Sequence, residues 1–100
     1  MPKGYWIAQV DVNSDEGYNP YAAANAAIFK KFSGRFIIRA GKSESMEGKA
    51  RSRNVVIEFL SYEAALVCYR SPEYAKAIAL RQANADADLI VIEGYDGPQP

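Results

Sequence analysis

A few charged side chains in strand-like segments could do chemistry in this sequence of 100 residues. Arg39 lies near the end of one such segment, Glu58 lies in another, and Asp11 lies in the first. Arginine presents a planar fork of donors that suits a carboxylate, and a carboxylate among apolar side chains can have a raised pKa suited to proton transfer. We therefore take Arg39 and Glu58 as candidate catalytic residues, with Arg39 as the anchor for an anion and Glu58 or Asp11 as a base.

Three further side chains complete the candidate site. Gln9 shares the strand alternation of Asp11, and Tyr69 and Tyr74 flank a Ser-Pro pair at a predicted helix start. The tyrosines could line a ligand entrance or act as acids, and simple core packing is the alternative. We expect the ligand to be a small molecule, partly apolar, with an acidic or carbonyl group, bound by Gln9, Asp11, Arg39, Tyr69 and Tyr74.

The sequence lacks the side chains that most metal and haem sites need. It has no histidine and only one cysteine, Cys68. Histidine-based triads and intrachain disulfides are thereby excluded, and we expect no metal, haem or other cofactor. Cys68 falls within a helical pattern, which predicts a buried, inert thiol.

Charge and hydropathy argue against nucleic-acid and membrane partners. Twelve basic residues balance twelve acidic ones. The basic loop 41–52 also contains Glu44 and Glu47 and has no aromatic residue on which a base could stack. No segment has the apolar length of a membrane span or the pattern of a signal peptide, so we expect a cytoplasmic protein.

The order of predicted elements indicates the fold class. Strands are expected at 5–12, 35–40, 53–60 and 87–95, and a helix at 20–32 that begins at Asn19-Pro20. A second helix runs from Ser61 to about Ala83, with a break at Pro72. This βαββαβ order is typical of an α+β ferredoxin-like domain with a four-stranded antiparallel sheet and both helices on one face. We assign residues 1–95 to this domain and 96–100 to a flexible tail.

Strand alternation separates two sheet faces. The apolar face, expected under the helices, comprises Ala8, Val10, Val12, Phe36, Ile38, Ala40, Val55, Ile57, Phe59, Ile90 and Ile92. The other face is mixed, and its apolar members are Ile7, Ile37, Val56, Leu89 and Val91. Because monomers rarely expose such patches, we predict a homodimer through this open sheet face. Arg39 and Glu58 would lie there on neighbouring strands, so a cross-strand ion pair is a structural alternative to a ligand site.

The sequence resembles the bacterial family known as domain of unknown function 1330. The resemblance spans nearly the whole chain and is carried by Gly4–Ile7, Gly34–Gly41, Glu47-Gly48, Val55–Phe59, Tyr69–Tyr74, Leu80-Arg81 and Ile92–Gly94. It implies a dimeric α+β barrel, in which two ferredoxin-like sheets face each other. Relatives with that fold include cofactor-free monooxygenases, lactone isomerases and haem enzymes.

Three hypotheses on function stay open. The first is a small-molecule-binding or cofactor-independent enzymatic barrel acting on a small carboxylate or carbonyl compound. The second is a non-catalytic structural or regulatory homodimer, whose barrel is filled by Ile7, Ile37 and Val91. The third is an accessory or stress-response module that acts through a protein partner.

Overall fold

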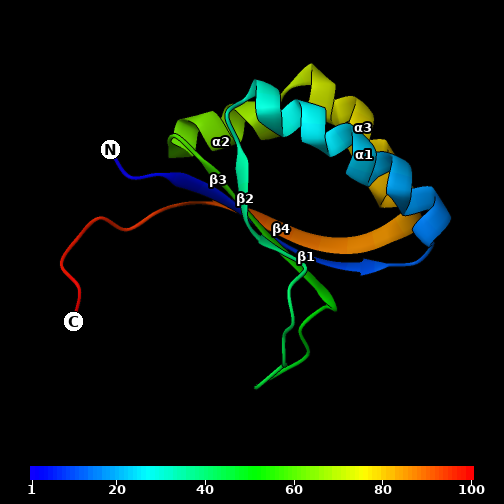
Figure 1. Ribbon diagram of the computed structural model, residues 1–100, viewed down its shortest axis with the longest axis horizontal. Coiled ribbons are helices and arrows are strands. Elements are labelled where there is room, and N and C mark those ends of the chain that lie inside the picture. The colour runs from blue at the N-terminus through cyan, green and yellow to red at the C-terminus, as the bar shows by residue number, and fades with distance from the viewer.

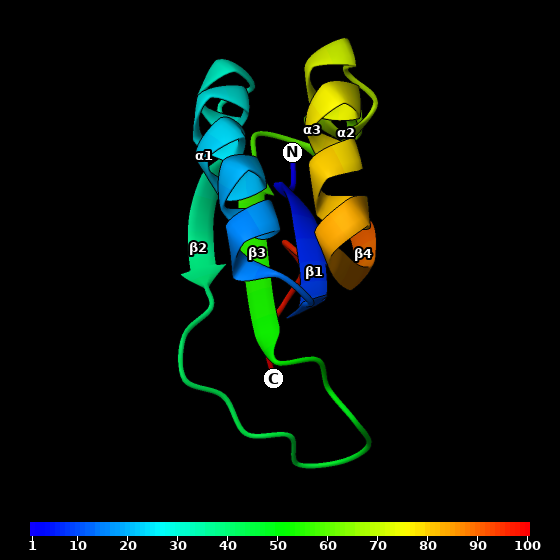
Figure 2. The same ribbon diagram turned by 90° about the vertical axis from the view of Figure 1, so that its right-hand side faces the viewer.

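A four-stranded antiparallel sheet carries all the helices on one face (Figure 1). The computed structural model describes residues 1–100. Its elements are β1 (Gly4–Val12), α1 (Asp15–Lys31), β2 (Arg35–Arg39), β3 (Arg53–Phe59), α2 (Tyr62–Tyr69), α3 (Pro72–Asn84) and β4 (Ala85–Glu93). The strand order is β2-β3-β1-β4, and α1 runs beside α3 above the sheet (Figure 2). The predicted ferredoxin-like α+β fold is confirmed.

Helix α1 begins earlier than its proline indicated. Ser14 is the N-cap, and its hydroxyl accepts a hydrogen bond from the backbone N–H of Gly17. Asp15 and Glu16 then place negative charge in the first turn, where the helix dipole favours it. The predicted start at Asn19-Pro20 is therefore wrong, and Pro20 lies inside the helix.

The second helical region is divided as the sequence predicts. Ser61 caps α2 and Ser71 caps α3, each by accepting a backbone N–H three residues on. Pro72 stands at the first position of α3, where its missing N–H is not needed. The Ser71 hydroxyl also donates to the carbonyl of Cys68 at 2.7 Å, so the break between the helices is fixed by hydrogen bonds.

Trp6 is the centre of the core. It is 1% exposed, and its ring centroid lies 4.9–5.4 Å from those of Phe29, Phe59, Tyr69 and Tyr74. Its Nε1 donates to the carbonyl of Ala65, which satisfies its one polar atom. Aromatic side chains from both layers thus fill the space between sheet and helices.

Cys68 is fully buried beside this core, as predicted. Burial raises the pKa of its thiol to about 12. The thiol therefore stays protonated at neutral pH, and a thiolate nucleophile at this position is not available.

The alternation predicted for β4 is inverted. Leu89 lies opposite Ala8 and Val91 opposite Trp6, so both face the helices. Ile90 and Ile92, expected in the core, are 53% and 44% exposed on the open face. The register with β1 decides the face, because paired residues of neighbouring strands share it.

A β-bulge also exchanges the sheet faces on which the last side chains of β2 lie. The pairing with β3 shifts between Phe36 and Ile38, which leaves Ile37 as the extra residue. Beyond the bulge, Ile38 lies on the open face, and Arg39 lies opposite Val55 on the helix-covered face. The prediction that placed Ile38 under the helices and Arg39 on the open face is wrong for this reason.

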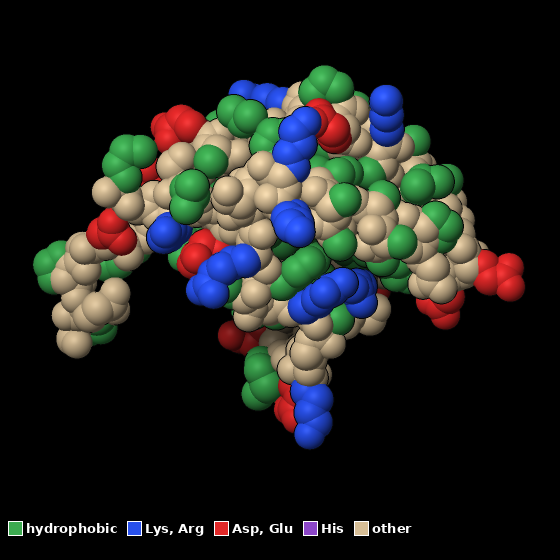
Figure 3. Space-filling model, turned by 45° about the horizontal axis from the view of Figure 1, so that its top comes forward, with side chains coloured by type: hydrophobic (Ala, Val, Ile, Leu, Met, Phe, Trp, Pro, Cys, Tyr) green, Lys and Arg blue, Asp and Glu red, His purple; other side chains and the backbone are tan.

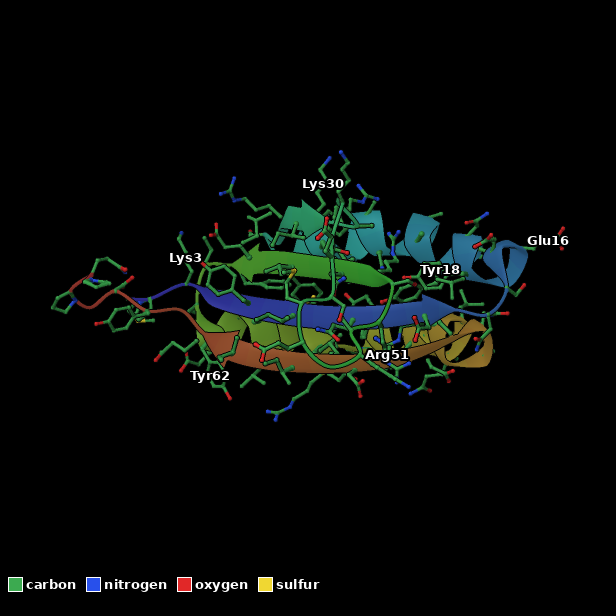
Figure 4. All side chains as sticks on the ribbon, turned by 90° about the horizontal axis from the view of Figure 1, so that it is seen from below. Lys3, Glu16, Tyr18, Lys30, Arg51 and Tyr62 are labelled. Atoms are coloured by element: carbon green, nitrogen blue, oxygen red, sulfur yellow. The ribbon has the colours of Figure 1, made fainter.

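The open face of the sheet carries a band of apolar side chains and the base of the loop between β2 and β3. The band consists of Ile7, Ile38, Val56, Ile90 and Ile92. The loop 40–52 projects from the sheet on this side, away from the helices (Figure 1). Arg51, labelled in Figure 4, holds the base of this loop against the sheet: its Nη1 donates to Asp11 and its Nε to Asp88, both at 3.0 Å.

None of the helices combines the length and the apolar character needed to span a bilayer.

Candidate functional site

A partly enclosed cavity lies on the helix side of the sheet. It has about 30 Å³ of interior space, enough for one or two water molecules, and about 480 Å³ when its open mouth is included. Its lining combines aromatic and aliphatic side chains with polar ones: Trp6, Ala8, Val10, Tyr18, Tyr21, Ala22, Asn25, Phe29, Phe36, Arg39, Arg53, Val55, Ile57, Arg81 and Leu89. We call it the arginine cavity.

Three different elements bring the arginines together. Arg53 begins β3 opposite Val10, which places it on the helix-covered face. Arg39 reaches the same face because of the bulge in β2. Arg81 comes from α3, seven residues after Tyr74 and on the same buried side of that helix.

No carboxylate lines the arginine cavity, although three cations do. Arg81 is only 6% exposed. Figure 3 looks over α1 towards the β2 edge and shows Lys and Arg side chains gathered in the middle of this surface. A buried guanidinium without a counter-charge favours an anion as its partner.

Every buried polar side-chain atom that lacks a partner belongs to this cavity. These atoms are Oδ1 of Asn25, Nε of Arg53 and Nε of Arg81. Asn25 is itself 9% exposed, on the inner side of α1. Since buried polar groups in native proteins are nearly always paired, their collection in one place indicates a polar occupant.

A chain of hydrogen bonds supports the cavity wall. Arg81 Nη1 donates to the Tyr74 hydroxyl at 3.0 Å, and the hydroxyls of Tyr74 and Tyr21 are 2.7 Å apart. Burial raises the pKa of Tyr74, so its phenol stays neutral. The guanidinium carbons of Arg53 and Arg39 lie 5.7 Å and 4.2 Å from the ring centroids of Tyr18 and Phe36, respectively. Cation–π contacts thus help to hold the arginine side chains.

The predicted pairing of Arg39 with Glu58 is wrong. Glu58 lies on the open face, where it accepts from Arg35 Nε at 2.9 Å and from the Tyr5 hydroxyl at 3.1 Å. The hydrogen bond from Arg35 holds the pKa of Glu58 below its usual range, which is unfavourable for a general base. Arg39 and Glu58 face opposite sides of the sheet, so one site cannot contain both.

The other predicted ligand contacts are divided in the same way. Gln9 and Asp11 lie on the open face, and the Ser52 backbone N–H holds the pKa of Asp11 below its usual range. Tyr69 packs edge-on against Trp6. Of the predicted set, only Arg39 lines the arginine cavity. Tyr74 does not line it but makes hydrogen bonds to two lining residues, Tyr21 and Arg81.

Three polar residues of the cavity were not predicted as site residues: Asn25, Arg53 and Arg81. A signal was available for Arg81, because positions 74, 77, 78 and 81 form one stripe of α3 and an arginine interrupts its apolar character. Asn25 likewise interrupts the buried stripe of α1. A polar residue within an apolar helical stripe indicates either an internal partner or a ligand.

Solved structures share the fold at low sequence identity. A protein of unknown function from Rhodopseudomonas palustris is 18% identical, with a TM-score of 0.75 over 96% of this chain and 85% of that one. SnoaB, a cofactor-independent oxygenase from Streptomyces nogalater, is 12% identical, with a TM-score of 0.68 over 100% and 97%. A dimeric protein of unknown function and ferredoxin-like fold from Bacteroides fragilis is 14% identical, with a TM-score of 0.61 over 93% and 97%.

No curated protein matches the chain in sequence. The family described as a domain of unknown function, DUF1330, matches residues 3–95, which include every strand and helix and every residue of the arginine cavity. This chain therefore belongs to the DUF1330 family.

Proposed function

We propose that the protein binds a small, partly apolar anion, such as a short carboxylic acid, in the arginine cavity. The observation that carries this proposal is the pair of unpartnered, buried Nε atoms of Arg53 and Arg81 in a cavity without any acidic side chain. A carboxylate accepts such donors in their own plane and supplies the missing negative charge.

The remaining lining supports the same ligand class. Phe36, Val55 and Leu89 offer apolar surface to a carbon chain, and the narrow interior accommodates only a small polar head. The acid would therefore place its carboxylate among the arginines and its apolar part towards the mouth. A second candidate function is enzymatic: the protein would convert such a ligand without a cofactor. The similarity in fold to SnoaB supports it, because SnoaB is a cofactor-independent oxygenase.

Thermal unfolding in chloride-free buffer tests the binding proposal. Propionate at ten times its Kd should stabilise the protein by about 1.4 kcal/mol, which corresponds to roughly 5–10 °C in Tm for a domain of this size. Arg53→Leu should abolish the shift. Arg70→Leu is the matched control, because Arg70 is an exposed arginine that ends α2 outside the cavity.

Two results would count against an anion site. One is that no short carboxylate shifts the Tm of the wild type. The other is that Arg53→Leu and Arg70→Leu retain the same shift. In either case the anion site is rejected, and the non-catalytic structural homodimer is the better hypothesis.

We also propose that the open sheet face binds a second copy of this chain. Ile7, Ile38, Ile90 and Ile92 are each 37–53% exposed there, and with Val56 of β3 they form one band across the four strands. A related structure with this fold is dimeric, and the projecting loop 40–52 would border a partner on the same side. A second sheet would remove these side chains from water.

Sedimentation equilibrium at micromolar concentration tests the dimer. Ile90→Asp places a charge in the apolar band and should produce a monomer of 11 kDa. Val67→Asp is the control, because Val67 is 58% exposed on α2, away from the open face. A monomeric wild type, or an Ile90→Asp variant that dimerises as well as the control, would contradict the proposal.

A further inference from the structure

We infer that the Tyr21 hydroxyl is a hydrogen-bond donor to the ligand in the arginine cavity, and that it selects acids with a carbonyl oxygen next to the carboxylate. This inference rests on the proposed anion site and goes further, because it names the substrate class: small 2-oxo acids. The hydrogen bonds from Arg81 through Tyr74 to Tyr21 support it.

The direction of the chain follows from counting donors. A guanidinium only donates, so the Tyr74 oxygen accepts from Arg81. Tyr74 is 0% exposed, and besides the Arg81 donor its hydroxyl has one partner, the Tyr21 oxygen at 2.7 Å, which is the one acceptor within reach of its proton. The Tyr74 proton therefore points to the Tyr21 oxygen, because the reverse arrangement would leave that proton unpaired in the core.

Once Tyr21 accepts from Tyr74, its own proton is free to point elsewhere. Tyr21 lines the cavity, and no acceptor for its proton lies within hydrogen-bond distance in the protein. The chain also polarises each hydroxyl in turn, starting from a positive charge, so Tyr21 is a better donor than an isolated phenol. A donor of this kind suits a carbonyl oxygen.

The residues that line the cavity therefore carry two kinds of unpartnered donor. Nε of Arg53 and Nε of Arg81 suit a carboxylate, and the Tyr21 hydroxyl suits a second oxygen beside it. A 2-oxo acid carries both groups on adjacent carbons. The interior of about 30 Å³ restricts this head to a few atoms and excludes bulkier polar groups.

The experiment compares pyruvate with propionate, which are close in size and differ by the carbonyl oxygen. Their dissociation constants are measured by NMR titration in chloride-free buffer at pH 7, where both acids are ionised. The wild type should bind pyruvate roughly 5–10 times more tightly, which is the effect of one net hydrogen bond. Tyr21→Phe should reduce this ratio to about one, because the second oxygen of pyruvate then has no hydroxyl donor. Tyr62→Phe is the control, because Tyr62 lies away from the cavity. In Figure 4 it lies towards the opposite end of the molecule from Tyr18, which lines the cavity.

A second measurement does not depend on the folding of a variant. In wild-type protein labelled with ¹³C at tyrosine Cζ, pyruvate should shift the Tyr21 resonance more than propionate does. Equal affinity for the two acids in the wild type, or a pyruvate preference that survives in Tyr21→Phe, overturns this inference while the anion site stands. Failure of both acids to bind the wild type overturns the anion site as well.

Discussion

Arg53→Met should make the ligand-free protein more stable while it removes ligand binding. The buried Nε of Arg53 has no hydrogen-bond partner. Leaving a buried donor unpaired costs about 1–3 kcal/mol, and the lower end applies because Arg53 as a whole is only half-buried. Methionine keeps an apolar stem of similar length and has no donor. Loss of the contact between the Arg53 guanidinium and the Tyr18 ring offsets part of this gain, so we expect a net gain of up to about 1 kcal/mol, or at most roughly 4–8 °C in Tm.

Differential scanning calorimetry in chloride-free buffer measures this change. Arg81→Met provides the contrast: it also removes an unpartnered Nε, but it takes the Nη1 donor from the buried Tyr74 hydroxyl, so it should raise the Tm less than Arg53→Met does. Arg39→Met should change the Tm little, since Arg39 is exposed at the mouth. If Arg53→Met lowers the Tm, then Arg53 is already paired without a ligand, and its Nε does not mark an anion site.

Three further predictions concern the rest of the fold. Cys68 should resist alkylation at pH 8 in the native protein and react fully once it is unfolded, because burial raises its pKa to about 12; rapid native labelling would disprove this burial. Arg35 lowers the pKa of Glu58, so the contribution of this carboxylate to stability is present above about pH 5 and is lost as the pH falls through its folded-state pKa. Glu58→Gln should therefore weaken the loss of stability at acid pH that urea titrations measure. An unchanged loss of stability would refute this. Gly4→Ala should destabilise the protein by about 1–3 kcal/mol, because the new methyl group would overlap the backbone carbonyl of Ser61; an unchanged urea midpoint would show that the chain yields there.

The elements of the fold were predictable because each has a local cause. Alternating β-branched and aromatic residues predicted the four strands, and Ser71-Pro72 predicted the boundary between α2 and α3. The start of α1 was misplaced because Asn19-Pro20 also fits a helix start. Ser14, with two acidic residues after it, caps the helix earlier.

The site was not predictable because it depends on register. Alternation assigns faces correctly only while a strand is regular, and one extra residue at Ile37 exchanges the faces of Ile38 and Arg39. The inversion in β4 has a different origin, because this strand is regular: Leu89 and Ile90 are both apolar, and only the pairing with β1 shows which of them faces the helices. Charged residues were thus assigned to the wrong partners although their strands were right.

The bulge in β2 links the two surfaces that we propose to be functional. With a regular strand, Arg39 would face the open side, where a charge would interrupt the apolar band, and Ile38 would face the arginine cavity. The extra residue Ile37 instead adds an isoleucine to the open face and a cation to the cavity mouth. An ion pair with Glu58 would have neutralised the charge of Arg39. Glu58 instead pairs with Arg35 on the open face, so no carboxylate of the protein neutralises the arginines of the cavity, and they can bind an anion.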